Sequence, residues 1–353
     1  MALGSFDYID VFGKERGLLP ISETEFWNMV KDIPITVDWL HPTSLPTPKA
    51  EQFAGATVNG LDFARIDRWI GLTPGLKYRM FFLNARENFA GAAMGSPEFS
   101  QKVGAWAKAV GNHVHAKDPN CKFGVLLVDE PSTTKQAEII TSWATAIKAA
   151  TNEVLIYEDP FFTNLSDPAI KTALGLCDML CLNQTYIMKR YPDLISQYVQ
   201  AASGKELWLY DTVPDPKELD PTDYYRLFAW RAFANQAKGI VYWSFTDVGP
   251  NQDAWAEDAS IRHSYSPLYL GSHLATSLHW EAIRDGLWDV QLFKTLATRS
   301  RHTTLENDAN AILAEVNDLA NGRSGASPWQ DETDSQKAEA LRVRATALLE
   351  RLK

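Results

Sequence analysis

Two adjacent carboxylates follow an apolar run in the stretch GVLLVDEPST, which covers residues 124–133. Asp129 and Glu130 come directly after four apolar residues and directly before Pro131. Moving a charged carboxylate out of water is costly, so a chain that places two of them at the end of a core segment must pair them or use them. The chemistry open to such a pair is proton transfer and the stabilisation of positive charge.

The pair also has a purely structural interpretation, in which Asp129 caps the following helix and Glu130 pairs with an arginine. Perturbed carboxylates at the rim of a cleft are more often functional, which favours the chemical interpretation. Pro131 bears on the local geometry, because the residue before a proline is pushed towards extended backbone. We therefore expect Glu130 to be extended and to stay outside a helix that is capped by Thr133 or Thr134.

The elements that must position this pair alternate between short apolar runs and longer amphipathic segments, as in repeated βα units. We predict an α/β fold, a closed (β/α)8 barrel of the TIM type, which needs about eight such units. An open doubly wound sheet is the second choice, and it is disfavoured because no GxGxxG or GxxxxGK[ST] motif follows a strand. The predicted strands cover residues 6–12, 34–40, 77–84, 122–129, 153–159, 178–184, 206–211 and 239–245.

Two helices have clear starting signals, and the end of the chain differs in character from the rest. Ser96-Pro97 opens one helix, and Pro221 opens another that we expect to end at Gly239. Beyond the last strand, residues 302–322 and 336–353 carry apolar side chains at helical spacing, and a polar joint separates them. We predict a catalytic barrel over residues 1–300 and a C-terminal helical hairpin over residues 301–353 that packs on it.

Charge and hydropathy exclude two classes of partner. The net charge of -10 and the lack of a Lys/Arg cluster argue against nucleic acid as a partner. No apolar run approaches the length of a membrane span, so we expect no membrane partner. The N-terminus lacks the basic flank and apolar stretch of a signal peptide. This leaves a cytoplasmic protein or an exported one whose signal has been removed.

The metal-ligating residue types are scattered. His113 and His115 are two residues apart on a predicted helix and so face different ways, and neither HExxH nor CxxC occurs. The odd number of cysteines, three, indicates free buried thiols. We expect neither a metal nor a cofactor.

In a barrel, catalytic groups lie at the C-terminal ends of the strands, which places Asp129 and Glu130 on that rim. Glycoside hydrolysis needs an acid for the leaving oxygen and a group that stabilises the oxocarbenium. Retaining enzymes commonly place two carboxyls about 5–5.5 Å apart across the scissile bond, which chain neighbours cannot readily straddle. Either Asp211 supplies the nucleophile from another strand, or the substrate's own 2-acetamido oxygen attacks.

Other polar and aromatic residues lie at predicted strand ends. Aromatic faces stack on sugar rings, so together these residues favour a polar, aromatic-lined cleft for a carbohydrate substrate. The candidate substrate-binding residues are Tyr157, Asn183, Tyr186, Tyr210, Asp211, Trp243 and Asp247.

The motif VDEP at residues 128–131 resembles the catalytic pair of glycoside hydrolase family 123, the β-N-acetylgalactosaminidases. The block YWSFTDVGPNQDAW at residues 242–255 and the segment 264–296, which contains WEAIRDG, resemble the C-terminal half of that family's barrel. The resemblance spans roughly residues 123–296.

The resemblance implies a retaining exo-glycosidase that acts on β-linked N-acetylgalactosamine or a related 2-acetamido sugar. Asp129 would orient the acetamido group, and Glu130 would act as acid and then base. Two alternatives stay open: a two-carboxylate retaining glycosidase that uses Glu130 and Asp211, and a barrel that binds glycans without cleaving them.

Overall fold

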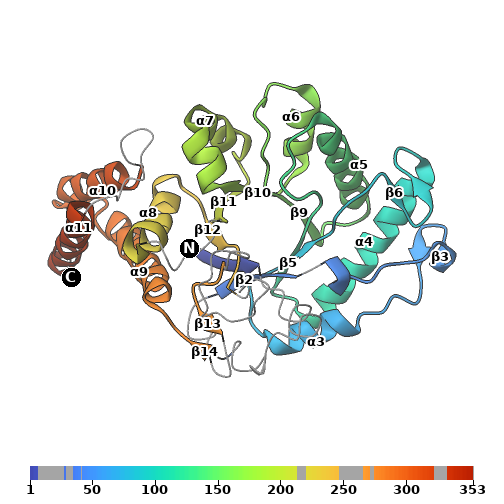
Figure 1. The fold of residues 1–353 in the computed structure, drawn as a ribbon, viewed down its shortest axis with the longest axis horizontal. Coiled ribbons are helices and arrows are strands. Elements are labelled where there is room, and N and C mark those ends of the chain that lie inside the picture. Colours follow the sequence, from blue (N-terminus) through green and yellow to red (C-terminus); the bar gives the residue numbers. More distant parts are fainter. Residues whose placement is uncertain are drawn as a thin grey trace, which may run out of the picture.

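The computed structural model describes residues 1–6, 28, 35–40, 42–212, 220–245, 265–270, 274–321 and 332–352. Eight parallel strands form a closed barrel in the order β1-β12-β11-β10-β9-β8-β5-β2, and β2 pairs with β1 to close it (Figure 1). The predicted (β/α)8 architecture is therefore confirmed. The barrel strands are β1 (Ala2–Phe6), β2 (Ile35–Leu40), β5 (Tyr78–Phe82), β8 (Lys122–Leu126), β9 (Val154–Glu158), β10 (Met179–Asn183), β11 (Glu206–Asp211) and β12 (Gly239–Tyr242).

Several strand boundaries differ from the sequence prediction by one or two residues, and the larger differences are at β1, at β8 and at β12, which ends at Tyr242 and not at residue 245. β1 ends at Phe6, where the predicted first strand begins, and residues 7–12 lie outside the described part of the chain. β8 ends at Leu126 and not at Asp129. The backbone N–H of Leu127 donates to the carboxylate of Glu158 over 3.1 Å, so a side chain takes the place of a strand partner there.

Helices surround the barrel, and three of their ends illustrate the local chemistry (Figure 1). Ser96 caps α4 by accepting the N–H of Phe99, and Thr133 caps α5 with a reciprocal capping box. The helical segment that begins at Pro221 ends at Ala234, earlier than predicted, and Gly239 begins β12. The helices are α3 (Ala64–Leu72), α4 (Pro97–Lys117), α5 (Thr134–Ala150), α6 (Pro168–Leu176), α7 (Pro192–Ala201), α8 (Leu227–Ala234), α9 (Leu278–Arg299), α10 (Glu306–Asn321) and α11 (Glu332–Arg351).

Short elements complete the described chain. The 3₁₀ turns are η1 (Pro42–Ser44) and η2 (Ala50–Gln52), and the π-helical turns are η3 (Gln184–Lys189) and η5 (Thr222–Arg226). Three two-stranded hairpins lie outside the barrel: β3 (Phe53–Ala54) with β4 (Thr57–Val58), β6 (Asn88–Phe89) with β7 (Ala92–Ala93), and β13 (Tyr269–Leu270) with β14 (Leu274–Ala275).

The barrel interior is filled by large side chains. Trp208 is fully buried, and its register partner on β12 is Gly239. A Cβ at Gly239 would lie 2.5 Å from the Trp208 ring, so glycine leaves the room that the indole occupies. At the starts of their strands, Lys122 contacts Glu206 over 2.7 Å and Tyr78 donates to the same carboxylate. The interior is therefore packed and not open.

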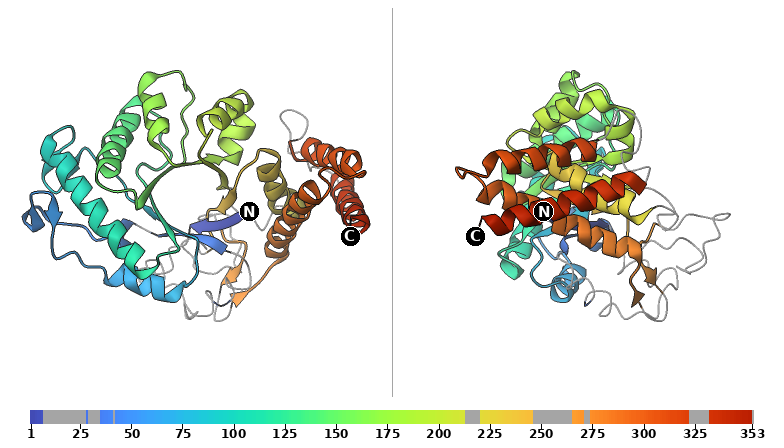
Figure 2. Two further views of the ribbon diagram at one scale, coloured as in Figure 1. Left: turned by 180° about the vertical axis from the view of Figure 1, so that it is seen from behind. Right: turned by 90° about the vertical axis from the view of Figure 1, so that its left-hand side faces the viewer.

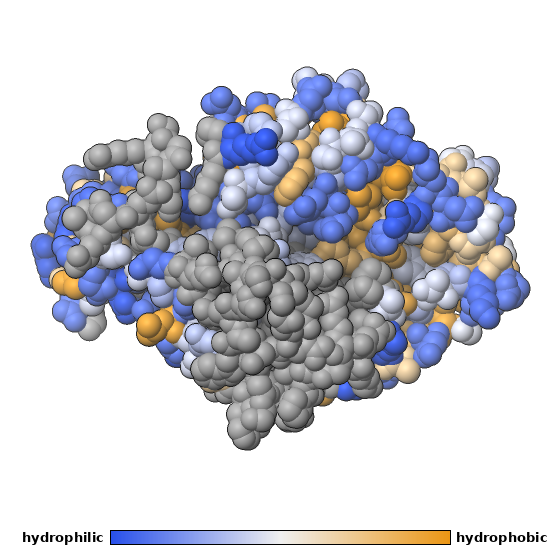
Figure 3. Space-filling view, viewed as in Figure 1, coloured by the Kyte–Doolittle hydropathy of each residue, from blue (hydrophilic) through white to orange (hydrophobic). Residues whose placement is uncertain are grey.

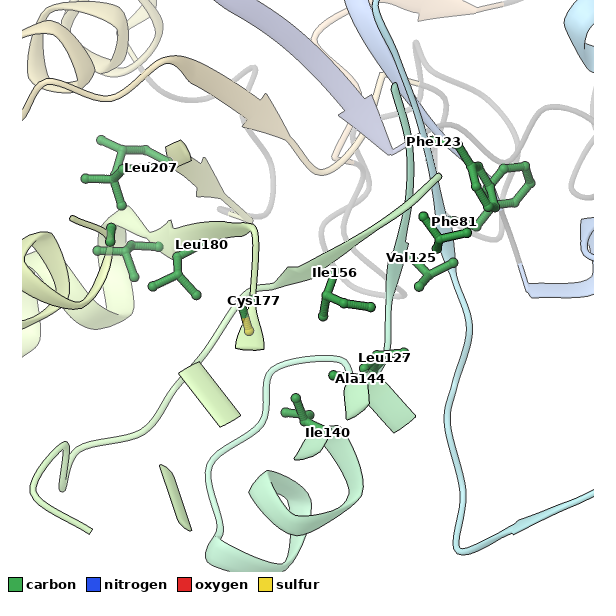
Figure 4. Packing of buried hydrophobic residues seen from close by; sticks show 14 of the residues in the cluster. Phe81, Phe123, Val125, Leu127, Ile140, Ala144, Ile156, Cys177, Leu180 and Leu207 are labelled. Atoms are coloured by element: carbon green, nitrogen blue, oxygen red, sulfur yellow. The ribbon is translucent and has the colours of Figure 1, made fainter. Parts of the chain in front are cut away.

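A second apolar layer lies between the strands and the surrounding helices. In Figure 4, Val125, Leu127 and Ile156 point towards the face of α5 that carries Ile140 and Ala144. All five side chains are buried. Strand side chains alternate in direction, so the residues next to these in the sequence face the barrel interior. One strand therefore contributes side chains to both apolar layers.

The C-terminal helices share an apolar cluster with α8. Trp230 on α8, Phe293 on α9, Ile312 on α10 and Leu341 on α11 belong to it. Figure 2, right, shows α9, α10 and α11 side by side at this end of the molecule. The buried carboxylate of Asp289 adds a contact over 2.6 Å to Nε of Arg226. α10 and α11 thus form the expected helical pair on the barrel helices, while the division into domains at residue 300 stays a prediction.

Where the chain is described, the face of the molecule drawn in Figure 3 is mainly hydrophilic. In Figure 3, apolar side chains gather around β9 and are surrounded by hydrophilic ones. Within the described residues, no helix is both long and apolar enough to cross a membrane.

Candidate active site

Asp129 and Glu130 lie three and four residues beyond the end of β8, at the C-terminal end of the barrel. The main chain is held there by its neighbour. The N–H of Glu130 donates to Oδ1 of Asp159 over 2.9 Å, and the N–H of Phe161 donates to the carbonyl oxygen of Pro131 over 2.8 Å. The loops that follow β8 and β9 are therefore joined by two hydrogen bonds that the main chain after β8 makes, one at Glu130 and one at Pro131.

The backbone of Glu130 is not extended, and the prediction from Pro131 is wrong. Its φ is 46°, which is the left-handed region. This conformation costs a residue with a side chain about 1–3 kcal/mol and persists only where surrounding structure imposes it. The hydrogen bond to Asp159 and the one made by Pro131 impose it here. Strained backbone of this kind often occurs at functional sites.

The side chain of Glu130 is half-buried and hydrogen-bonded. The hydroxyl of Tyr210, on β11, donates to Oε1 of Glu130 over 2.6 Å, and Asn183 hydrogen-bonds to the same Tyr210. Burial raises the pKa of Glu130, and the nearby charge of Asp129 adds to this, while the Tyr210 hydrogen bond opposes it. A carboxyl with a raised pKa is suited to give a proton and later to take one.

Asp129 reaches the surface at the rim, but the protein around its carboxyl still excludes part of its water. This desolvation raises the pKa of Asp129, and a hydrogen bond with the carboxyl of Asp159 opposes the rise. Neither part of the structural alternative is found among the described residues. Thr133 caps α5, and the side-chain partner of Glu130 is Tyr210.

Two further carboxyls beside the pair were missed from the sequence. Glu158 ends β9, Asp159 follows it directly, and both side chains are almost fully buried. Burial and neighbouring carboxyls raise the pKa of both well above the usual range. The sequence does contain a pattern that could have identified them. YEDP at residues 157–160 repeats the pattern of VDEP at residues 128–131, an acidic pair followed by a proline at a strand end.

The structure brings Tyr210, Asn183 and Tyr186 to the pair. Asn183 is buried and its Oδ1 accepts the N–H of Tyr186 over 2.6 Å, at the start of the π-helical turn η3. Tyr186 is half-buried and lies within electrostatic reach of Glu130. Its ring stacks on Phe161 with centroids 4.2 Å apart. The exposed parts of these two rings offer an aromatic surface beside the acid.

The other candidates are placed less favourably for substrate contact. Tyr157 is fully buried and hydrogen-bonds to Cys181 inside the barrel. Asp211 is 1% exposed, and its carboxylate accepts from Gln184 over 2.7 Å and from Thr185 over 3.1 Å. Trp243 is half-buried against Phe82. Asp247 lies outside the described residues.

No metal-binding group of three or more His, Cys, Asp or Glu occurs in the part of the chain that the structure describes.

No family model and no curated protein matches the sequence. Solved structures do match. A family 123 glycoside hydrolase from Clostridium perfringens, studied for glycolipid glycan hydrolysis, is similar over 100% of this chain and 69% of its own, with a TM-score of 0.65 and 12% identity. At this identity the likeness shows the fold. The resemblance noted in the sequence is thus confirmed at the level of the barrel.

Two other glycoside hydrolases share the fold less closely. An endo-β-1,4-mannanase from Thermotoga petrophila is similar over 83% of this chain and 77% of its own, with a TM-score of 0.51 and 15% identity. A β-galactosidase from the psychrophilic Marinomonas ef1 is similar over 90% of this chain and 62% of its own, with a TM-score of 0.51 and 12% identity. The chain therefore has a barrel like those of glycoside hydrolases.

Proposed function

We propose that this protein is a glycoside hydrolase of the family 123 type, which removes a β-linked 2-acetamido sugar, N-acetylgalactosamine first among the candidates, with retention of configuration. The observation that carries the proposal is the adjacency of Asp129 and Glu130 at the barrel rim, where Glu130 has a raised pKa and a fixed orientation. The likeness to a family 123 enzyme over the whole chain supports it.

The proposed first step uses both members of the pair. Protonated Glu130 gives its proton to the glycosidic oxygen, and the bond between that oxygen and the anomeric carbon breaks. The carbonyl oxygen of the substrate's acetamido group forms a bond to the same carbon, which gives a cyclic oxazolinium. The carboxylate of Asp129 would accept the acetamido N–H and stabilise the positive charge that develops there.

The second step restores the enzyme. Glu130, now ionised, takes a proton from a water molecule. The oxygen of this water attacks the anomeric carbon, and the bond between that carbon and the acetamido oxygen breaks, which opens the oxazolinium ring. The sugar leaves with its original configuration, because the carbon has been inverted twice. Tyr210 supports both steps, since its hydroxyl keeps Oε1 of Glu130 in one place.

The alternative with Asp211 as nucleophile is disfavoured by burial. A nucleophile has to reach the anomeric carbon, but Asp211 is 1% exposed and already accepts hydrogen bonds from Gln184, Thr185 and the N–H of Thr212. The alternative of a barrel that only binds glycans is also disfavoured. It does not explain the strained backbone of Glu130 or the buried carboxyls beside it, because binding alone requires neither.

The test is a panel of 4-nitrophenyl β-glycosides that differ in the sugar, with and without a 2-acetamido group. We expect cleavage of the 2-acetamido substrates and no comparable cleavage of the matched 2-hydroxy sugars. Glu138→Gln is the control variant, because Glu138 is exposed on α5 away from the pair. Equal rates on 2-hydroxy and 2-acetamido sugars would reject the assisted mechanism, and an inactive panel would reject the assignment as a whole.

A further inference from the structure

Asp159 connects the two members of the carboxylate pair. It is the first residue after β9 and is 2% exposed. One of its oxygens, Oδ1, accepts the N–H of Glu130 over 2.9 Å, and its carboxyl also hydrogen-bonds with the carboxyl of Asp129. A single buried side chain therefore contacts the main chain of the acid and the side chain of its neighbour.

A hydrogen bond between two carboxyls requires one proton, because an ionised carboxylate is only an acceptor. Asp159 is the buried member and Asp129 the exposed one. Desolvation therefore places the proton on Asp159 and leaves Asp129 as the carboxylate. The direction of the pKa shift agrees, because burial and the charges of Asp129 and Glu158 raise the pKa of Asp159.

The titratable groups that surround Asp159 come from four barrel elements. In the described part of the chain, the charged groups that act most strongly on Asp159 are carboxyls, which disfavour its ionised form, while the hydrogen bond from the N–H of Glu130 favours that form. The neighbours are Asp129 and Glu130 after β8, Tyr157 and Glu158 on β9, Cys181 on β10 and Tyr210 on β11.

We infer that Asp159 is a positioning residue that works in its protonated form: its O–H donates to Asp129, and its other oxygen holds the backbone of Glu130. This inference rests on the proposed function, in which Asp129 has to present a carboxylate to the acetamido group. Asp159 itself touches no substrate. Loss of its proton would put two negative carboxyls side by side and turn Asp129 away from its working position.

The decisive variant is Asp159→Asn, because asparagine copies a protonated aspartic acid. Its amide oxygen can accept the Glu130 N–H, and its NH₂ group can donate to Asp129. We expect this variant to keep most of the wild-type kcat. Asp159→Ala lacks both contacts, and a misplaced catalytic group can cost about 10²-fold in rate, so we expect a loss of that order. Equal large losses in both variants, with both proteins folded, would overturn the inference.

The pH profile separates this role from simple packing. With an activated 4-nitrophenyl leaving group, little protonation by Glu130 is needed, so the alkaline loss of kcat reports Asp159. Activity should fall as pH rises through the raised pKa of Asp159, and this fall should disappear in Asp159→Asn. An unchanged alkaline limb in that variant would contradict the inference.

Infrared difference spectroscopy tests the proton without any substrate. The spectrum of the wild-type protein minus that of the Asp159→Asn variant should show the carbonyl stretch of a protonated carboxylic acid. This band should vanish at alkaline pH. Glu158→Gln is the matched control, since it should leave this band in place. If the glycoside panel is inactive but the band is present, the proposed function fails while the protonated Asp159 stands. If the panel is active and the band is absent, the inference alone fails.

Discussion

The hydroxyl of Tyr210 donates to Oε1 of Glu130 over 2.6 Å, and this bond joins β11 to the loop after β8. The two residues are distant in sequence, so barrel closure is what brings them together. A hydrogen bond to a carboxylate favours its ionised form, so the bond lowers the pKa of Glu130 against the larger effect of burial. Tyr210 thus sets how far the acid's pKa rises.

Tyr210→Phe should raise the pKa of Glu130 further, because it removes a hydrogen bond to the ionised form. A general acid must be protonated to act, so activity on a poor leaving group is lost as pH rises through that pKa. The alkaline limb of kcat/KM should therefore move to higher pH. Tyr198→Phe is the control, since Tyr198 is also a buried tyrosine but donates to the carbonyl oxygen of Phe162 and not to a carboxyl of the pair. A limb that moves to lower pH would contradict the assignment.

Glu130→Gln removes the proposed acid and base while keeping its size. We expect the rate on glycosides with poor leaving groups to fall by about 10²–10⁴-fold. Substrates with activated leaving groups should lose less in the first step, since they need less protonation. Measured kcat values on a paired set of such substrates check this. Wild-type rates on an unactivated glycoside would exclude Glu130 as the acid.

The sequence was sufficient for the fold and for the place of the pair. Alternating apolar and amphipathic segments predicted the barrel, and the end of an apolar run placed Asp129 and Glu130 at its C-terminal end. These features depend on local patterns, which the chain carries within each segment.

The details that failed depend on contacts between segments. The rule for residues before proline predicted an extended Glu130, but the hydrogen bond to Asp159, in the loop after β9, imposes a positive φ. Asp211 ends its strand as predicted, yet Gln184 and Thr185 cover it. Such contacts are decided by which loops meet above the barrel, and the sequence of one strand does not contain that information.

The Trp243→Ala variant tests whether the half-buried indole of Trp243 contacts the substrate. Trp243 follows β12 and packs edge-on against Phe82. We expect a higher KM with a small change in melting temperature. Trp208→Ala is the comparison, because that indole is fully buried inside the barrel and its loss should cost about 3–5 kcal/mol of stability. An unchanged KM with a large fall in melting temperature would mean that Trp243 serves the core.

Gly239→Ala tests the packing that fills the barrel. The added Cβ would lie 2.5 Å from the Trp208 ring, and overpacking of this kind costs about 1–3 kcal/mol. The matched variant is Gly71→Ala on α3, where nothing lies within 4 Å and alanine should stabilise the helix by about 0.5–1 kcal/mol. Urea unfolding of both variants measures the difference. Equal stabilities would mean that Trp208 moves aside freely.

The comparison of Asp129→Asn with Asp211→Asn decides between the two proposed nucleophiles. If the acetamido oxygen attacks, Asp129→Asn should reduce kcat strongly, because the charge that stabilises the oxazolinium is lost. Asp211→Asn should leave kcat within a few-fold of wild type, because Asp211 is buried beneath Gln184 and Thr185.

Two inhibitors check the same choice without mutation. A thiazoline analogue of the oxazolinium should bind tightly, because it resembles the charged intermediate that the site would stabilise. A 2-fluoro glycoside should leave no covalent adduct, since the enzyme supplies no nucleophile. The burial of Asp211 makes this the expected result, because its carboxylate cannot reach an anomeric carbon at the rim while it holds Gln184. Mass spectrometry that located a glycosyl adduct on Asp211 would reverse the conclusion and assign it the nucleophilic role.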